Sequence, residues 1–439
     1  MDLKTATVAV ETLGCKVNQY ETSYFLEVLK LAGYRLVPFG RRADIYIVHS
    51  CAVTARAGSQ TRQLLRKARR ANPDAMIVAA GCYAQLEGDR IAGEKLATHI
   101  LGNPAKFNIL EWLNRPGSLE EPCLALDRSP RSCLEFEILP VSGMHTGRTR
   151  ATLKIQDGCD SFCSYCVVPY LRGPSRSLPA DLVLAQMEQL IRAGYHEIVL
   201  TGIHLGKWGR DLEPQLSLSR LIERIGSSRR PGRLRLSSLE PEELDAHLLD
   251  AIESAPWICR HFHIPLQSAD PEILARMRRP YNARYYAELV SQIHSVFPDA
   301  SIGTDVLTGF PGESEKQFEN TLSFIEALPF AYLHVFPFSP RPGVAAAGLP
   351  GLIEGVELKR RAAALQALSR LKKRAFRQKF IGQCLEVLIE TGVQPRLWEG
   401  LSNNYIRVFV HADENNCFGK AVRVKATGFK GEDLEGTPE

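Results

Sequence analysis

Short apolar runs alternate with amphipathic stretches over the first third of the chain. The runs TVAVETLGC, ADIYIVHSC and AMIVAAGC are rich in small and β-branched apolar residues, as strands buried on both faces of a sheet are. Between them lie NQYETSYFLEVLKLAGY and SQTRQLLRKARRANP, which carry apolar residues at helical spacing. This alternation predicts a parallel α/β domain over residues 1–135, with helices on the faces of its sheet.

The same alternation continues in the middle of the chain with six further strand candidates. They are ATLKIQDGC, HEIVLTGIHL, RLRLSSLEP, HFHIPLQS, SIGTDVLTGF and YLHVFPFS. Amphipathic stretches such as PADLVLAQMEQLIRAGY separate them. Six β/α units over residues 146–372 predict a partial TIM-like (β/α)6 barrel, open on one side, with its active site at the carboxyl ends of the strands.

The last segment, 373–439, has a different pattern. CLEVLIET, LWEGLSNNYIRVFVHA and KAVRVKATGF are short runs punctuated by Gly, Asn and Asp, which predict a small antiparallel β-barrel. The stretch before it, from Leu358 to Phe380, holds nine Lys or Arg residues and no acid. A basic helix beside a β-barrel is typical of a nucleic-acid contact, and a solvated helix face is the alternative. The candidate RNA contacts are Lys372, Lys373, Arg374 and Arg377.

The composition is that of a soluble globular protein, because 45% of the 439 residues are apolar, 23% are charged and the net charge is +5. No apolar run is long enough to cross a bilayer, and the N-terminus lacks the regions of a signal peptide. We therefore expect a cytoplasmic protein with no membrane partner. There, eleven cysteines favour metal or redox chemistry over disulfides, whereas the eleven histidines show no spacing typical of a metal site.

Two sets of three cysteines suggest metal chemistry. The first set ends the predicted strands of the first domain, so one sheet edge would gather it: Cys15, Cys51 and Cys82. The second set follows the first barrel strand at C-x-x-x-C-x-x-C spacing: Cys159, Cys163 and Cys166. Zinc and iron–sulfur clusters both suit close thiolates, but structural zinc normally takes a fourth ligand, and a [4Fe–4S] cluster on three cysteines leaves one iron open. The other cysteines are interpreted as ordinary thiols: Cys123, Cys133, Cys259, Cys384 and Cys417.

The second cysteine set, placed after the first strand of a β/α barrel, resembles the radical S-adenosylmethionine superfamily. The resemblance implies a [4Fe–4S] cluster whose open iron binds the amino and carboxylate groups of S-adenosylmethionine, which is cleaved reductively to a 5′-deoxyadenosyl radical. It also implies that Tyr165 lies against the adenine and that the backbone at Thr201, Gly202 and Ile203 meets the methionine amino group. Ser237 and Glu240 end the third barrel strand, where a polar group could bind the ribose hydroxyls, with a solvated side chain as the alternative for Glu240. Gln267 is a further cofactor candidate and Asp305 a substrate candidate, with a structural hydrogen bond as the alternative for each.

Further motifs narrow the resemblance to the methylthiotransferases. TLGCKVNQYET, HSCAVTARA and GCYAQ resemble that family's N-terminal domain, and GTDVLTGFPGE and HIPLQS resemble later parts of it. The C-terminal segment resembles the family's RNA-binding TRAM domain. By this resemblance, Cys15, Cys51 and Cys82 hold a second [4Fe–4S] cluster that carries the sulfur to be inserted. TLGCKVNQYE is more like the branch that acts on N6-threonylcarbamoyladenosine in tRNA than the branch that acts on N6-isopentenyladenosine.

The resemblance implies an enzyme that adds a methylthio group to C2 of N6-threonylcarbamoyladenosine at position 37 of tRNA, with S-adenosylmethionine as radical source and methyl donor. Expected partners are the tRNA anticodon stem-loop, an electron donor such as flavodoxin or ferredoxin, and a sulfur donor. Arg172 and Arg176 are candidate substrate contacts, since arginines bind carboxylates and phosphates well. The alternatives are action on N6-isopentenyladenosine, a radical enzyme that only methylates, and a non-catalytic RNA-binding protein with a redox-sensing cluster.

Overall fold

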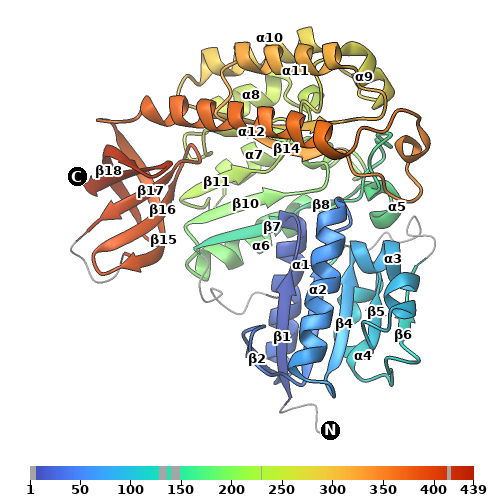
Figure 1. Ribbon diagram of the computed structural model, residues 1–439. Coiled ribbons are helices and arrows are strands. Elements are labelled where there is room, and N and C mark those ends of the chain that lie inside the picture. The colour runs from blue at the N-terminus through green and yellow to red at the C-terminus, as the bar shows by residue number, and fades with distance from the viewer. Residues whose placement is uncertain (1–5, 128–135, 139, 141–148, 229, 413–416) are drawn as a thin grey trace. The chain divides into compact units, whose positions relative to one another are not determined.

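The computed structural model describes residues 6–127, 136–138, 140, 149–228, 230–412 and 417–439. It divides into two compact units that are described separately (Figure 1). The first unit comprises Met1–Ser142, Gln156–Ser177 and Ser339–Ala347. The second unit comprises Gly143–Ile155, Leu178–Phe338 and Gly348–Glu439.

The first unit is built on a six-stranded parallel sheet of order β2-β1-β3-β4-β5-β6. Its strands are β1 (Thr7–Thr12), β2 (Arg35–Val37), β3 (Ile45–Ser50), β4 (Met76–Gly81), β5 (His99–Leu101) and β6 (Cys123–Ala125). Its helices are α1 (Lys16–Leu31), α2 (Ala55–Ala71), α3 (Cys82–Gly93), η2 (Ala105–Asn108) and α4 (Ile109–Leu113). The predicted parallel α/β architecture is confirmed, and the sheet gains three short strands that the apolar runs did not indicate.

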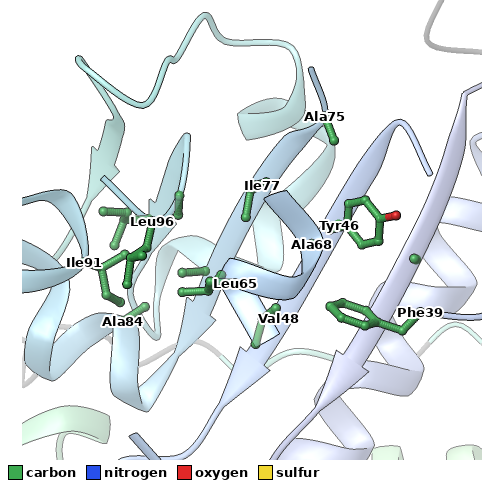
Figure 2. Close-up of a cluster of buried hydrophobic side chains, with 14 of the residues drawn as sticks. Phe39, Tyr46, Val48, Leu65, Ala68, Ala75, Ile77, Ala84, Ile91 and Leu96 are labelled. Atoms are coloured by element: carbon green, nitrogen blue, oxygen red, sulfur yellow. The ribbon is translucent and has the colours of Figure 1, made fainter. Parts of the chain in front are cut away.

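Successive residues of the central strands alternate between two cores, one on each face of the sheet. On one face, Val48 and Ile77 pack with Leu65 of α2 in a cluster that Figure 2 shows. On the other face, Ile47 and Val78 pack in a second cluster with residues of α1 and α4. Each fully buried aliphatic side chain contributes about 1.5–3 kcal/mol. The two cores fix the sheet register, and with it the strand ends that carry the first cysteine set.

The first unit also contains residues 156–177, which were predicted to belong to the barrel domain 146–372. Here β8 (Gln156–Asp157) pairs antiparallel with β9 (Arg176–Ser177), and α5 (Val168–Arg172) lies between them. Val167 and Leu171 pack in one apolar cluster with Ala52 and Cys82, which explains the grouping. The second cysteine set therefore belongs to the same compact unit as the first.

The second unit contains the six predicted parallel strands, arranged as two three-stranded sheets of order β11-β10-β7 and β12-β13-β14. An isolated parallel bridge joins Leu234 of β11 to Ile258, which precedes β12. The strands are β7 (Arg150–Lys154), β10 (Glu197–Thr201), β11 (Arg233–Leu236), β12 (His261–His263), β13 (Ser301–Thr308) and β14 (Tyr332–Pro337). The helices are α6 (Ala180–Arg192), α7 (Leu218–Gly226), α8 (Ala246–Glu253), α9 (Pro271–Arg276), α10 (Ala283–Val296) and α11 (Glu315–Ala327). Short 3-10 helices are η4 (Leu205–Lys207) and η5 (Pro241–Glu243), with η6 (Ala345–Gly348) at a join between the units. The partial (β/α)6 barrel is confirmed.

The C-terminal part of the second unit is a long helix followed by a closed five-stranded barrel of order β15-β16-β17-β19-β18. The elements are α12 (Gly355–Gln378), β15 (Cys384–Gln394), β16 (Leu397–Ser402), β17 (Arg407–His411), β18 (Ala421–Lys430) and β19 (Asp433–Pro438). The barrel is antiparallel except for the parallel pair β17–β19, a departure from the prediction. The predicted domain boundary at residues 372 and 373 falls inside α12, because its helical pattern continues to Gln378. Among the residues the structure describes, no helix is long and apolar enough to cross a membrane.

Candidate functional site

The first cysteine set converges at one edge of the parallel sheet of the first unit. Cys15 caps α1 just after β1, Cys51 follows β3 directly, and Cys82 begins α3 after β4. These three strands are neighbours in the sheet, and the three thiols interact electrostatically with one another. Gly14, at φ 122°, passes so close that a Cβ atom there would lie 2.6 Å from the Cβ of Cys51. Only glycine fits this position, so the turn after β1 can bring Cys15 close to Cys51.

The surroundings of Cys15 and Cys51 favour the neutral form of their thiols unless a cationic partner is bound. Cys51 and Cys82 are buried, whereas Cys15 is exposed. Burial, and then the neighbouring thiols of Cys15 and Cys82, raise the pKa of Cys51 to about 12. Metal binding needs thiolates, so the ligated metal must supply the positive charge that stabilises them.

Behind the cysteines lies a buried network of charges centred on Arg172, at the end of α5. Its guanidinium donates to both carboxylate oxygens of Glu21, at 2.9 and 3.1 Å, and to Asp157 Oδ1 at 3.0 Å. Lys106 Nζ lies 2.8 Å from Glu21 Oε2, and Arg176 lies 3.1 Å from Asp157 Oδ2. Burial lowers the pKa of His49, which contacts Glu21, to about 4, so this imidazole is neutral at pH 7. The described contacts of this network thus join three cations, Arg172, Lys106 and Arg176, to the carboxylates of Glu21 and Asp157.

The Arg172 guanidinium also interacts electrostatically with the first cysteine set. Burial alone would lower the pKa of Arg172, but Cys82, Glu21 and Asp157 raise it well above its usual value. Three thiolates on a [4Fe–4S] core carry a net negative charge, and a buried cation beside them would offset it. The residues present therefore fit an anionic iron–sulfur cluster on the first cysteine set.

Two asparagines connect the charge network with the cysteines. The side chain of Asn18 lies 3.6 Å from Cys15 Sγ and accepts a hydrogen bond from Arg172 at 3.0 Å. The Asn103 amide lies 3.5 Å from Cys82 Sγ and donates to the Leu171 carbonyl at 2.8 Å. Neither asparagine was predicted as a site residue. The three-residue spacing of Asn18 and Glu21 on one helix could have indicated the first, whereas Asn103 follows a different strand and has no local signal.

The second cysteine set lies in the loop between β8 and α5. The Cys159 N–H donates to the Gly173 carbonyl at 3.1 Å, and the Cys166 N–H donates to the Cys163 carbonyl at 3.0 Å. Phe162 adopts a φ of 45°, a left-handed conformation that is uncommon outside glycine. Cys163 is buried, whereas Cys159, Cys166 and the cofactor candidate Tyr165 are partly exposed. The loop therefore has a defined backbone with accessible ligands.

The spread of the sulfur atoms bears on which metal each cysteine set fits. Among the described residues, which include all six of these cysteines, a single group of three Cys, His, Asp or Glu side chains brings its ligand atoms within 4.8 Å of one another. That group contains no cysteine. In neither cysteine set do the three sulfur atoms all lie within 4.8 Å of one another. Three sulfurs bound to one zinc ion, each about 2.3 Å from the metal, would lie within that distance of one another. The wider spread fits a cube with an iron at each ligated corner.

The cofactor candidates of the second unit follow the barrel strands. Thr201 ends β10, and Gly202 and Ile203 come next; Ser237 follows β11. The Ser237 hydroxyl oxygen is buried and has no hydrogen-bond partner within the described residues, so it is available to a ligand. Glu240 is not free in this way, because its carboxylate pairs with Arg279.

Gln267, the last cofactor candidate, has a strained backbone. Its φ is 65°, and its N–H and C=O bond to Asp305 and Leu307 of β13 at 2.8 and 2.9 Å. Left-handed conformations of this kind cost on the order of 1–3 kcal/mol and persist where the surrounding structure enforces them, often at functional sites.

Several substrate candidates have partners within the protein. Arg172 is 3% exposed and lies between carboxylates, so its guanidinium has partners within the protein, and its expected substrate contact stays a prediction. Arg176 bonds to Asp157 and to the Arg172 carbonyl. Lys372 Nζ donates to the carbonyls of Glu326 and Leu328, and Arg377 pairs with Asp433 at 2.7 Å. The charged groups of these four side chains therefore form hydrogen bonds or ion pairs within the protein, which their positions in the sequence did not indicate.

The remaining RNA candidates line a hollow of about 340 Å³ on α12. Its lining is Ala367, Arg370, Leu371, Lys373, Arg374, Arg377 and Glu432. Arg370 and Arg374 are exposed, and the Arg374 guanidinium lies 4.5 Å from the ring centroid of Phe429. Arg370 was not among the predicted contacts, although it belongs to the same basic run.

The remaining described cysteines differ in burial. Cys259 and Cys417 are buried, Cys123 is partly buried and Cys384 is exposed; Cys133 lies outside the described residues. Burial raises the pKa of Cys259 to about 12, as expected of an inert core thiol.

Two family models and several relatives match the chain. Residues 7–102 match the uncharacterized protein family UPF0004, and residues 153–325 match the radical SAM superfamily. The chain is 34% identical over 426 residues to threonylcarbamoyladenosine tRNA methylthiotransferase MtaB of Bacillus subtilis, covering 96% of this chain and 93% of that protein. It is 35% identical over 431 residues to the MtaB of Thermotoga maritima, covering 97% and 96%.

Two more distant similarities complete the comparison. A tRNA-2-methylthio-N(6)-dimethylallyladenosine synthase of Clostridium botulinum is 29% identical over 433 residues, covering 96% of this chain and 91% of that protein. The structure of the radical S-adenosylmethionine methyltransferase TsrM from Kitasatospora setae superimposes with a TM-score of 0.57 at 15% identity, covering 78% of this chain and 77% of that chain, and shares its fold. The chain therefore belongs to the radical S-adenosylmethionine methylthiotransferase family, whose cofactors are S-adenosylmethionine and [4Fe–4S] clusters.

Proposed function

We propose that this chain adds a methylthio group to C2 of N6-threonylcarbamoyladenosine at position 37 of tRNA. The observation that carries the proposal is the pair of cysteine sets on separate loops of one compact unit, in a chain 34–36% identical to three threonylcarbamoyladenosine tRNA methylthiotransferases. The C2 hydrogen of adenine offers little to acid–base catalysis, so a cofactor has to supply the reactive species.

Each cysteine set would hold one cluster. Cys159, Cys163 and Cys166 would hold the cluster that binds S-adenosylmethionine, and Cys15, Cys51 and Cys82 the cluster that carries sulfur. When bound, these groups supply the radical, the sulfur and the methyl group. Arg172 and Lys106 would offset the negative charge of the cluster on Cys15, Cys51 and Cys82. Asn18 and Asn103 would orient the cysteine ligands of that cluster.

The candidates at the barrel strand ends are suited to polar groups of S-adenosylmethionine. The unpartnered hydroxyl of Ser237 is suited to a ribose hydroxyl, and the backbone after β10 at Thr201, Gly202 and Ile203 to the methionine amino group. Gln267, held in its strained conformation by β13, would add a polar contact at the neighbouring strand end. Tyr165, partly exposed beside Cys166, would lie against the adenine.

The basic hollow on α12 would hold the RNA. Arg370, Lys373 and Arg374 offer cations in a concave surface, which suits the phosphates of the anticodon stem-loop. An unstacked loop base such as position 37 is the kind of RNA feature that proteins recognise specifically. A tRNA substrate implies work in the cytoplasm, with a small electron-transfer protein such as flavodoxin or ferredoxin and a sulfur donor as partners.

The experiment is an anaerobic assay of the reconstituted protein with matched anticodon stem-loops. The loops carry N6-threonylcarbamoyladenosine, N6-isopentenyladenosine or unmodified adenosine at position 37, and mass spectrometry measures the modified nucleosides and 5′-deoxyadenosine. We expect methylthio product from the first RNA at a rate at least about tenfold above the second, a difference of roughly 1.4 kcal/mol in activation free energy.

The other outcomes decide between the alternatives. Product from the isopentenyl RNA alone would favour the synthase activity of the 29%-identical relative. A methylated nucleoside without sulfur would indicate an enzyme that only methylates. RNA binding without 5′-deoxyadenosine would indicate a binding protein with a redox-sensing cluster.

A further inference from the structure

Three adjacent strands of the second unit place polar side chains on the same face of their sheet. Thr304 bonds to the Tyr286 hydroxyl of α10 at 3.1 Å, so it faces the helix layer. Its neighbour Asp305 therefore points to the opposite face, because side chains alternate along a strand. In the parallel register, Asp305 pairs with His334 of β14. Gly303, two residues before Asp305 on the same strand, pairs with His263 of β12.

These three side chains form the group noted above, whose ligand atoms lie within 4.8 Å of one another. His263 Nε2 lies 2.8 Å from Asp305 Oδ1, and His334 Nδ1 lies 3.2 Å from the same oxygen. One carboxylate oxygen of Asp305 is thus within hydrogen-bond distance of both imidazoles, which is the convergence that a shared ion needs.

A tyrosine orients the more buried of the two histidines. The Tyr332 hydroxyl lies 3.0 Å from His263 Nδ1 and 2.8 Å from His261 Nε2. Metal-binding histidines commonly donate their second ring N–H to such a partner, which fixes the tautomer and the ring orientation. Glycine at position 303 makes room for this tyrosine, because a Cβ atom there would collide with the Tyr332 ring.

We infer that His263, Asp305 and His334 form a binding site for a divalent first-row transition-metal ion, with Tyr332 positioning His263. Two imidazoles and one carboxylate suit zinc or ferrous iron and leave further coordination positions for water or an anionic oxygen ligand. Neighbouring ligand atoms around such an ion, with bonds of about 2.1 Å, lie roughly 3 Å apart, close to the spacings of 2.8 and 3.2 Å seen here.

The site is also accessible and chemically distinct from the cysteine sets. The His334 side chain is 53% exposed, so an ion can reach it without unfolding of the barrel. Its ligands are nitrogen and oxygen, whereas both cysteine sets offer sulfur. The inference does not depend on the proposed tRNA reaction, because it concerns a further ion beyond the two clusters.

The test is a metal count on the cluster-reconstituted protein. The sample is freed of loosely bound metal on a chelating resin and equilibrated with zinc, and zinc, iron and sulfide are then measured together. We expect one zinc per chain with the iron content unchanged, and loss of that zinc in Asp305→Asn and in His334→Gln. Tyr332→Phe should keep the ligands but weaken zinc binding about 10–100-fold.

His411→Gln is the matched control, since His411 is also half-exposed and pairs with one carboxylate, that of Glu435 at 3.2 Å. It should retain the zinc. Equal zinc in the wild type and Asp305→Asn would overturn the inference. If a variant fails to fold by circular dichroism, zinc X-ray absorption of the wild type decides: a nitrogen and oxygen shell with imidazole scattering supports the site, and a sulfur shell overturns it.

Discussion

Arg172 carries an unusually large share of the buried charge pairing in the first unit. Its guanidinium donates hydrogen bonds to Glu21, Asp157 and Asn18, although the residue is only 3% exposed to solvent. Removing one partner of a buried ion pair typically costs about 3–5 kcal/mol, because the other charge is left without compensation. The sequence could place this arginine near a cysteine loop but not inside the protein, since its partners come from α1 and β8.

The first prediction is therefore that Arg172→Gln lowers the free energy of unfolding by roughly 3 kcal/mol or more, measured by urea denaturation. The same change should make the reduction potential of the cluster on Cys15, Cys51 and Cys82 more negative, because a nearby positive charge is lost. That potential is measured in protein whose second cysteine set is changed to alanine, so that one cluster titrates. Arg172→Lys keeps the charge and should restore most of the potential but only part of the stability. An unchanged potential in Arg172→Gln would contradict the electrostatic role.

At the scale of elements, the contact of β10 and β11 with the C-terminal barrel depends on the buried carboxylate of Glu197. Glu197 of β10 pairs with Arg235 at 2.7 Å and with Arg233 at 2.6 Å. These arginines also donate to the carbonyls of Leu401 and Ser402, in and at the end of β16. Burial would raise the pKa of Glu197, but Arg235 and Arg233 outweigh it and lower the pKa to about 2.

This contact gives the second prediction. A lowered pKa means that the unfolded state binds the proton more readily, so the stabilisation is fully present above about pH 4.5 and is lost as the pH falls toward 2. Urea unfolding of cluster-free protein between pH 6 and 3 should show this loss, and Glu197→Gln should be less stable at pH 7 and depend less on pH. A Glu197→Gln protein with the same pH dependence as the wild type would show that other groups cause it.

The long and strongly patterned elements could be predicted from sequence, and the short ones could not. β2, β5 and β6 have three residues each, too few for a recognisable run, and β19, DLEGTP, lacks apolar alternation. The His263, Asp305 and His334 group escaped notice because its members lie 42 and 29 residues apart. Parallel register, not sequence spacing, brings them together.

The third prediction concerns α12 and revises the expected RNA contacts. Changing Arg370, Lys373 and Arg374 to Gln should weaken tRNA binding and reduce the slope of log affinity against log salt by up to about 2, since each phosphate contact contributes about 0.7. Lys372→Gln is the control and should bind normally, because the Lys372 ammonium bonds to the carbonyls of Glu326 and Leu328. Affinity and slope unchanged in the triple variant would mean that α12 is a solvated helix that only supports the barrel.

At the scale of the whole molecule, chain order and compact units do not coincide. Residues 156–177 follow the first barrel strand in sequence, yet they group with the N-terminal sheet. Apolar patterns could predict the α/β domain, the partial barrel and the small β-barrel in their order along the chain. They could not predict that residues 156–177 join the first unit, because this depends on side-chain contacts such as those of Leu171 with the apolar cluster around Cys82. The consequence is that both cysteine sets share one unit and have separate loops.

Separate loops predict a separation of roles that can be measured. The intact protein should hold about eight irons after anaerobic reconstitution, and changing either cysteine set to alanine should leave about four. With Cys15, Cys51 and Cys82 changed, 5′-deoxyadenosine should still form, because the loop of Cys159, Cys163 and Cys166 keeps its own backbone hydrogen bonds, while methylthio product should fall to background. With the second set changed, neither product should form. If the first variant made methylthio product at the wild-type rate, the inserted sulfur would have to come from elsewhere, and the assignment of the first cysteine set would be wrong.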